Sequence, residues 1–181
     1  MMIKHRWNCL TTDETWAQTP YTGWSEYANQ MVSTIASKSK DPSTKVGAWI
    51  TDQDVGTLST GYNGLPRGAD DNKLERYERP EKYKWFSHAE RNAIFQAAKQ
   101  GVSTQGGRIY CNLKPCMDCA VAIVQAGITD VLVFDTREPV NDEYLQDQER
   151  VIQLFKECEV FYYVRERVLE DIGVQPPQEV I

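Results

Sequence analysis

The residues best suited to chemistry lie in two short stretches, an H-x-E sequence at His88 and Glu90 and a P-C-x-x-C sequence at residues 115–119. One histidine and two cysteines can together hold a single zinc ion. Three protein ligands leave the fourth tetrahedral position open to water, which distinguishes a catalytic zinc site from a closed structural one. The spacing therefore predicts a zinc site made by His88, Cys116 and Cys119. Glu90, two positions after the histidine, is the predicted catalytic proton carrier.

Hydrolytic deamination of an aminopyrimidine is the reaction that suits this set of groups. Zinc lowers the pKa of a bound water to about 7, which makes water a nucleophile near neutral pH. One carboxylate can take a proton from that water, give it to the ring nitrogen and later protonate the leaving amine. Predicted helix starts at Ser87 and Pro115 add a positive dipole end to each half of the site, which favours the thiolates that zinc requires.

Each part of this pattern also has a structural explanation. Ser87 and Glu90 have the spacing of a capping box, in which the carboxylate only caps its own helix. A lone histidine is more often a core or surface residue, and a lone C-x-x-C sequence can be a redox pair or half of a structural zinc site. The combination of both halves, with Pro115 before the first cysteine, favours the catalytic zinc site.

Composition indicates one soluble domain. The chain has 181 residues, 41% of them hydrophobic, and no window approaches the roughly 20 apolar residues of a membrane span. Five cysteines, an odd number, favour a reducing compartment over a disulfide framework, and no apolar run of a secretory signal follows the first basic residues. We therefore expect a cytoplasmic protein, or one of the host cytoplasm if the chain is viral. The net charge of −6 argues against polynucleotide partners, whereas a small anionic substrate needs only a few local cations.

Hydrophobic periodicity predicts helices and strands that alternate after an initial hairpin. We expect helices at residues 24–38, 87–99, 116–125 and 143–158, and strands at 45–51, 55–62, 108–112, 131–134 and 160–164. This order predicts an α/β fold of three layers, with a central mixed sheet of about five strands and helices on both faces. We expect residues 1–181 to form one domain, with an N-terminal extension at 1–23, a catalytic core at 24–164 and a C-terminal tail at 165–181.

Two segments carry more specific expectations. The apolar stripe of the first helix includes Trp24 and Tyr27, which we expect in the core. Residues 65–83 form a long polar loop, and a loop of this length in a compact domain is usually a binding loop when it is ordered. Its cations include Arg67 and Lys82 and are candidates for phosphate contact, although most charged loop residues are simply solvated.

Further motifs extend the pattern beyond the zinc ligands. Residues 88–94 read H-A-E-R-N-A-I, residues 39–48 read S-K-D-P-S-T-K-V-G-A, and residues 61–68 read G-Y-N-G-L-P-R-G. With the P-C-x-x-C sequence, the first motif resembles the zinc-dependent cytidine deaminase superfamily, and the other two are similar to deoxycytidylate (dCMP) deaminases. The resemblance covers roughly residues 24–134. It implies the cytidine-deaminase-like α/β/α fold, hydrolysis of dCMP to dUMP and ammonia for thymidylate synthesis, and a homo-oligomer that is a hexamer in many members.

The resemblance also implies regulation and a set of binding residues. Residues 61–64 match the family's regulatory nucleotide motif, so we expect dCTP as activator and dTTP as inhibitor, with Mg²⁺ accompanying a triphosphate. The asparagine of this motif can also bind a deoxyribose hydroxyl, and the two glycines allow positive φ and close backbone approach. The residues expected to contact substrate or effector are Lys38, Gly61, Tyr62, Asn63, Gly64, Arg67 and Ala89. Lys38 stands where the family often has arginine, so the charge is kept without the bidentate fork.

Other readings of the sequence stay open at this point. One is a deaminase of dCTP or of a 5-substituted dCMP. A second is a nucleic-acid deaminase that acts on adenosine in transfer RNA, which the acidic balance argues against. A third is a zinc-stabilised nucleotide-sensing protein without turnover, which has no need of Glu90. Residues 69–83 lack the Cys and His that give some members of the family a second zinc, so we expect one zinc per chain.

Overall fold

The computed structural model describes residues 22–135, 137 and 141–164 of the chain. Most of the predicted extension at 1–23 and the whole predicted tail at 165–181 lie outside the described residues. The helices are α2 (Thr22–Ser37), the 3₁₀ helix η1 (Leu74–Tyr77), α3 (Lys82–Trp85), α4 (Ala89–Gln100), α5 (Met117–Gln125) and α6 (Asp142–Glu157). The strands are β1 (Gly47–Thr51), β2 (Thr57–Tyr62), β3 (Arg108–Cys111), β4 (Asp130–Val133) and β5 (Phe161–Val164). Within these ranges no helix is long and apolar enough to span a membrane.

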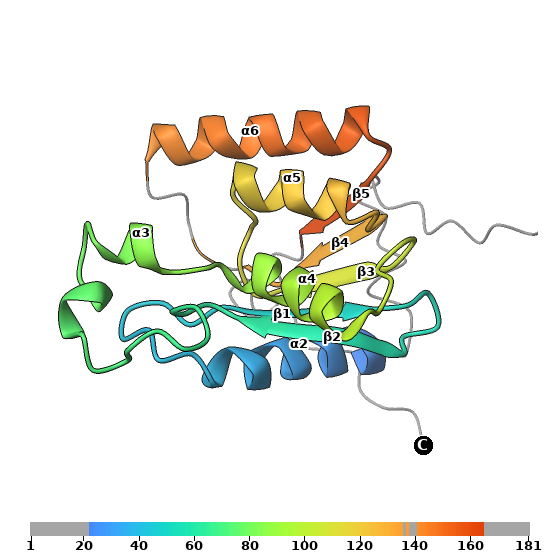
Figure 1. The fold of residues 1–181 in the computed structure, drawn as a ribbon. Coiled ribbons are helices and arrows are strands. Elements are labelled where there is room, and N and C mark those ends of the chain that lie inside the picture. Colours follow the sequence, from blue (N-terminus) through green and yellow to red (C-terminus); the bar gives the residue numbers. More distant parts are fainter. Residues whose placement is uncertain (1–21, 136, 138–140, 165–181) are drawn as a thin grey trace, which may run out of the picture.

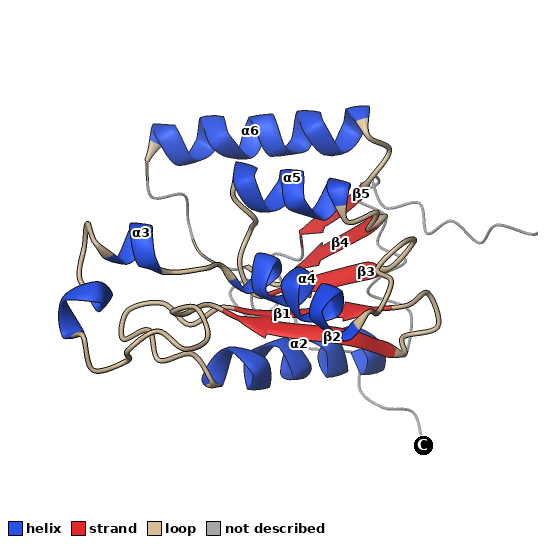
Figure 2. Ribbon diagram, in the orientation of Figure 1, coloured by secondary structure: helices blue, strands red, loops and turns tan. Residues whose placement is uncertain are grey.

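The strands form one sheet in the order β2-β1-β3-β4-β5, with α2 on one face and α4, α5 and α6 on the other (Figures 1 and 2). β1 pairs antiparallel with β2 and with β3, whereas β3, β4 and β5 are parallel. Parallel neighbours need a crossover, which α5 supplies between β3 and β4 and α6 supplies between β4 and β5. The prediction of a three-layer α/β fold with a mixed five-stranded sheet is confirmed.

The register of the sheet brings two strand ends to the same edge. In β1, Gly47 pairs with Tyr62, the last residue of β2, and Ala48 pairs with Cys111, the last residue of β3. β2 and β3 flank β1, so they end at the same edge of the sheet. The chain that follows each of these strands leads into α4 or α5, and both helices therefore begin at this edge (Figure 1).

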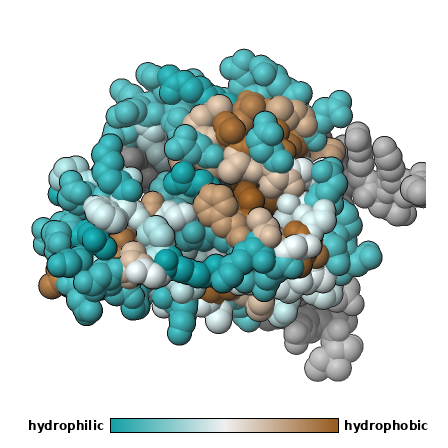
Figure 3. All heavy atoms as spheres, in the orientation of Figure 1, coloured by the Kyte–Doolittle hydropathy of each residue, from teal (hydrophilic) through white to brown (hydrophobic). Residues whose placement is uncertain are grey.

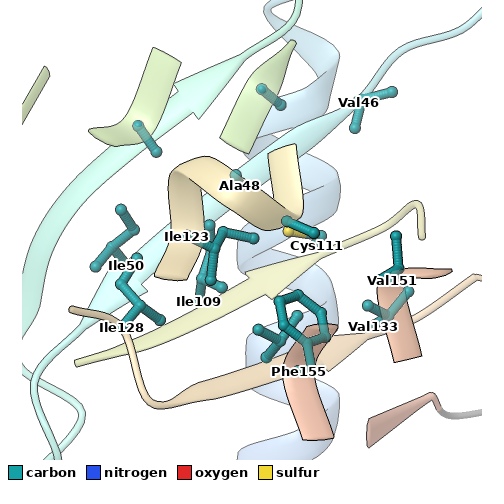
Figure 4. Packing of buried hydrophobic residues seen from close by; sticks show 14 residues of the cluster. Val46, Ala48, Ile50, Ile109, Cys111, Ile123, Ile128, Val133, Val151 and Phe155 are labelled. Carbon is teal, nitrogen blue, oxygen red and sulfur yellow. The ribbon is translucent and has the colours of Figure 1, made fainter. Parts of the chain in front are cut away.

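The main core lies between the sheet and the helices α4, α5 and α6. Figure 4 shows Ile123 of α5 beside Ile109 of β3, and Phe155 of α6 close to Val133 of β4. Each of these side chains is at most 1% exposed. Full burial of such a side chain contributes about 1.5–3 kcal/mol to folding. Ala93 of α4 belongs to the same cluster, so α4 approaches the sheet through a small residue.

α2 packs against the opposite face of the sheet through small residues. Its buried residues recur at helical spacing and are Ala28, Val32 and Ala36. A Cβ atom on Gly47 of β1 would lie 2.4 Å from the carbonyl oxygen of Val32, so strand and helix are in backbone contact at this position. The prediction that Trp24 and Tyr27 lie in the core is wrong, because these side chains are 62% and 45% exposed. The ring of Tyr27 meets the ring of Trp49 edge-on, with 5.7 Å between the ring centroids.

The segment predicted as a loop, residues 65–83, contains η1 and the start of α3, and its prediction as irregular throughout is wrong. Each of these helices has only four residues, too few for a helical period to show in the sequence. Contacts with buried residues attach the segment to the domain. The ring of Tyr77 meets the buried ring of Phe86 edge-on at 5.4 Å, and the Lys82 side chain is buried.

Gly61 allows β2 to lie directly against α4. A Cβ atom at this position would lie 2.3 Å from the backbone nitrogen of Ala93 and 2.4 Å from the carbonyl oxygen of Ala89. The predicted close approach is therefore confirmed at Gly61. The predicted positive φ is wrong for both Gly61 and Gly64, since neither adopts it.

We predict that Gly61→Ala lowers the free energy of unfolding by about 1–3 kcal/mol, because the added methyl group forces α4 away from β2. Gly64→Ala is the matched control. The structure has open space where its Cβ atom would lie, so its effect should stay within about 0.5 kcal/mol. Urea unfolding followed by circular dichroism measures both. Equal midpoints for the two variants would contradict the packing role of Gly61.

Candidate active site

The three predicted zinc ligands meet in one place. Nδ1 of His88 lies 3.5 Å from Sγ of Cys116 and 3.4 Å from Sγ of Cys119, and all three donor atoms lie within 4.8 Å of one another. Zinc–sulfur bonds of about 2.3 Å and a zinc–nitrogen bond of about 2.0 Å, at a tetrahedral angle, would place nitrogen and sulfur about 3.5 Å apart. The observed distances therefore fit a single zinc ion held by these residues.

Two helix starts position these donors. His88 is the N-cap of α4 and Cys116 is the N-cap of α5, both with extended backbone, and Cys119 follows in the first turn of α5. The helices predicted at 87–99 and 116–125 therefore begin two residues and one residue too early, respectively. Neither side chain makes an N-cap hydrogen bond to the backbone of its own helix, so both remain available as ligands. The positive ends of two helix dipoles face the site, which favours thiolate over thiol.

Glu90 lies beside the cluster in the first turn of α4 and is only 3% exposed. Burial raises the pKa of its carboxyl group, and the nearby His88 partly opposes this shift. A carboxyl group with a raised pKa can both accept and donate a proton closer to neutral pH. The capping-box explanation fails, because the backbone N–H of Ser87 donates to the carbonyl of Gly64 at 2.9 Å instead of to Glu90.

The pKa values of the two thiols are shifted in opposite directions. The pKa of Cys116 is lowered to about 4, chiefly by the hydrogen bond with Cys119 and further by His88, although burial opposes the change. The pKa of Cys119 is raised, first by the same hydrogen bond and then by burial. The hydrogen bond to Cys116 also raises the pKa of His88. The pair therefore keeps one proton between the two sulfurs, and a cation that replaces that proton can bind both.

Asn63, predicted to contact substrate or effector, uses its side chain within the protein. Oδ1 accepts from the backbone N–H of Val46 at 2.8 Å, while Nδ2 donates to Oδ2 of Asp41 at 3.0 Å and to the carbonyl of Thr44 at 2.8 Å. An amide group has two donor hydrogens, and both are used. One lone pair of Oδ1 is left, so the Asn63 side chain can offer a ligand a single acceptor site. Ligand contact by Asn63 stays a prediction.

The other predicted binding residues lie around the same edge of the sheet or on exposed positions. Gly64 pairs with Ser87, next to His88, and Tyr62 is 42% exposed at the end of β2. Ala89 is buried, but as the first residue of α4 its backbone N–H has no acceptor within the helix. Lys38 is exposed just after α2, and exposed Arg67 donates to Gln96 of α4. Their contact with a ligand stays a prediction.

A buried ion pair beside Asn63 was missed by the sequence reasoning. Lys82, considered above for phosphate contact, is 8% exposed and bonds to the fully buried Asp41 at 2.6 Å and to Oγ of Ser43 at 2.7 Å. Burial alone would raise the pKa of Asp41, but the hydrogen bonds from Lys82 and the Ser43 and Thr44 backbones hold it below its ordinary value. The S-K-D-P motif pointed to Asp41, whereas no sequence signal pointed to its partner 41 residues later.

A second group of supporting residues holds the turn that carries Cys116. Side chains from beyond β4 bond to the backbone of Lys114, Pro115 and Met117, and they belong to Asp135, Gln148 and Asp147. These residues were also missed, because single hydrogen bonds to backbone atoms leave no spacing pattern in a sequence.

Comparison with known proteins finds relatives of the part of the chain that contains the candidate site. The family model described as the cytidine and deoxycytidylate deaminase zinc-binding region matches residues 22–135. The human protein named deoxycytidylate deaminase is 36% identical over 128 residues, which cover 68% of this chain and 71% of that protein. The deoxycytidylate deaminase of Enterobacteria phage T4 is 30% identical over 160 residues, covering 65% of this chain and 82% of that protein.

A similar fold occurs in a solved structure from a cyanophage. The dCMP deaminase from cyanophage S-TIM5, in complex with dCMP and dUMP, has a TM-score of 0.60 and 25% sequence identity. The match covers 78% of this chain and 95% of that one. The sheet and the helices described above are therefore shared across nearly the whole of that protein.

We predict that Lys82→Met lowers the free energy of unfolding at pH 7 by about 3–5 kcal/mol, because it leaves the Asp41 carboxylate buried without a cation. Lys84→Met, an exposed change two residues later on α3, is the control and should stay within about 0.5 kcal/mol. The pKa of Asp41 is lowered in the folded state, so its stabilising effect is present above its unfolded pKa and is lost as the pH falls through the folded value. Denaturant unfolding at several pH values should show the Lys82→Met deficit shrinking as the pH falls below about 4. An equal deficit in both variants would contradict the ion-pair role.

Proposed function

Since the chain belongs to the cytidine and deoxycytidylate deaminase family, we propose that it catalyses the hydrolysis of dCMP to dUMP and ammonia. The observation that carries this proposal is the meeting of His88, Cys116 and Cys119 beside the buried Glu90. The names of the relatives support dCMP as substrate, and so does the similar structure that is described with dCMP and dUMP. The reaction is a route toward thymidylate.

We propose His88, Cys116 and Cys119 as the ligands of one zinc ion per chain. The donor set of one nitrogen and two sulfurs is typical of zinc, and its spacing fits a tetrahedral site with one position left open. When bound there, zinc supplies a Lewis acid that makes water nucleophilic near neutral pH. The description of the matching family model as a zinc-binding region supports the choice of metal.

Glu90 is the proposed proton carrier of the reaction. Its carboxylate takes a proton from the attacking water and delivers it to N3 of the cytosine ring as the C4–O bond forms. The carboxylate then takes the second proton of the attacking water from the new C4 hydroxyl and gives it to the amino group, so that the C4–N bond breaks, the C4 carbonyl forms and ammonia leaves. One water is consumed for each ammonia released, and Glu90 returns to its starting state. Burial of Glu90 suits this role, because it keeps bulk water away from the protons in transfer.

The nucleotide is proposed to bind along the edge of the sheet where β2 ends. The backbone N–H of Ala89 and the exposed backbone and ring of Tyr62 offer polar contacts, together with Gly61, Asn63 and Gly64 in the same segment. Lys38 and Arg67 are the proposed phosphate contacts, since both are exposed cations. We also propose that dCTP activates the enzyme and that dTTP inhibits it. The support for this regulation is the G-Y-N-G motif alone.

We also propose a homo-oligomer, with the hexamer of many family members as the expected state. Figure 3 shows a mostly hydrophilic face with apolar residues gathered around α5. Large apolar side chains that are more than 40% exposed occur on all three helices of this face, and they are Phe95, Val121, Leu145 and Ile152. Exposed apolar surface of this kind often marks a contact with another protein chain.

Ammonia release from dCMP, dCTP, deoxycytidine and 5-methyl-dCMP tests the substrate assignment. We expect selective turnover of dCMP, raised by added dCTP and lowered by added dTTP. Turnover of dCMP without a response to either triphosphate would support the enzyme and overturn the regulation. Preferred turnover of dCTP or 5-methyl-dCMP would replace the proposed substrate. Turnover of no monomer by zinc-loaded protein would favour a transfer RNA substrate or a nucleotide sensor.

Glu90→Gln should lower kcat for dCMP by at least about 100-fold, because the amide cannot carry the proton. Zinc content should stay at one per chain, since Glu90 is not a proposed ligand. Glu149→Gln, an exposed change of the same type on α6, is the control and should leave both values unchanged. The assay combines ammonia release with metal analysis. Turnover by Glu90→Gln within a few-fold of the wild type would exclude the proposed mechanism.

A further inference from the structure

The peptide group before Cys116 is held by a buried side chain of α6. Nε2 of Gln148 donates to the carbonyl oxygen of Pro115 at 3.0 Å, and Gln148 is 8% exposed. The hydroxyl of Tyr162 in β5 donates to Oε1 of Gln148 at 3.4 Å, which fixes the direction of the amide. Burial raises the pKa of Tyr162, so the hydroxyl keeps its donor proton.

The peptide group after Cys116 is held by Asp147 of α6, the residue just before Gln148. The backbone N–H of Met117 donates to Oδ2 of Asp147 at 3.2 Å. Met117 is the first residue of α5, where a backbone N–H has no acceptor within the helix, so Asp147 supplies the missing partner. A carboxylate at a helix N-terminus is also favoured by the helix dipole.

Together these two bonds fix the backbone of Cys116 on both sides. The dihedral angles φ and ψ of a residue describe the orientation of its two flanking peptide planes, and here each plane is bonded to α6. Cys116 has φ −76° and ψ 171°, and the direction of its Cα–Cβ bond follows from these planes. The side chain of Cys116 makes no N-cap hydrogen bond to the backbone of α5, and the backbone sets where its sulfur can lie.

Lys114, at the start of this turn, is held in the same way by Asp135, which follows β4. Oδ2 of Asp135 accepts from the backbone N–H of Lys114 at 3.3 Å, and Oδ1 accepts from the backbone N–H of Arg137 at 3.0 Å. Asp135 is 3% exposed, so this bond is protected from water. The turn from residue 114 to residue 117 therefore has side-chain partners along its whole length.

We propose that Asp147 and Gln148 are positioning residues for Cys116, and that Tyr162 acts by orienting Gln148. They keep the sulfur of Cys116 at the distance from His88 that one zinc ion requires. The inference rests on the proposed function, because it concerns the same zinc. All three residues lie outside the range 22–135 that the family model matches.

Zinc affinity of the full-length protein, measured by competition with a chelator, tests the proposal. Gln148→Leu and Asp147→Ala should each weaken zinc binding by about 10–100-fold, as loss of a residue that orients a metal ligand usually does. Tyr162→Phe should have a smaller effect, because the amide of Gln148 stays present. Asp147→Asn should restore near wild-type affinity, since its side-chain oxygen still accepts from Met117. Gln146→Leu, an exposed change on the same helix, is the control.

Two further readouts separate positioning from general stability. The visible spectrum of the Co²⁺-loaded protein reports ligand geometry and should change in Gln148→Leu and Asp147→Ala but not in the control. With saturating zinc, kcat for dCMP should fall while KM stays constant. If Gln148→Leu does not fold, Tyr162→Phe and the two Asp147 variants give the same comparison.

The possible failures have different meanings. Equal zinc affinity and equal Co²⁺ spectra in all variants and the control would overturn this inference and leave the proposed function in place. A fall only in the unfolding free energy of the zinc-free variants would do the same, since it would show a structural role alone. A wild-type protein that binds no zinc would overturn the proposed function and this inference with it.

Discussion

The candidate site depends on the close packing of β2 against α4. Because Gly61 has no side chain, the backbone of the strand touches the backbone of the helix, and α4 is held where β2 and β3 end. That contact brings His88 and Glu90 to the edge at which α5 also begins. The N-termini of α4 and α5 then lie beside each other, and their N-cap residues provide a nitrogen and a sulfur donor. A larger residue in β2 would separate the two halves of the site.

Several polar side chains around this edge are both buried and paired. Asp41 and Lys82 satisfy one another and reach Asn63 and Ser43, while Gln148 is satisfied by a backbone carbonyl and a tyrosine hydroxyl. A buried polar group without a partner costs about 1–3 kcal/mol, and more if it is charged. Complete networks of this kind fix one arrangement of the loops that surround the site, because any other arrangement breaks several bonds together.

The sequence was informative where the signal is local. His88 with Glu90, and Cys116 with Cys119, are spaced within one helical turn, so the spacing alone was enough to propose the residues that the structure then brings together. The alternation of strands and helices also predicted the sheet and its layers. Lys82 could not be assigned, since its partner is distant in the chain and a loop lysine usually faces solvent. Trp24 was misplaced because helical spacing aligns it with the buried residues Ala28 and Val32 but does not reveal where along the helix burial begins.

The hydrogen bonds on either side of Cys116 also set an order of events during synthesis. A chain leaves the ribosome from its N-terminus, so the motif that contains Cys116 emerges 30 or more residues before Asp147 and Gln148. Tyr162, which orients Gln148, emerges later still. The nascent chain therefore carries every proposed ligand of the metal well before it can hold the turn in its final shape. Maturation of the site is completed by α6 and β5, the last helix and strand that the structure describes, which contribute no proposed ligand.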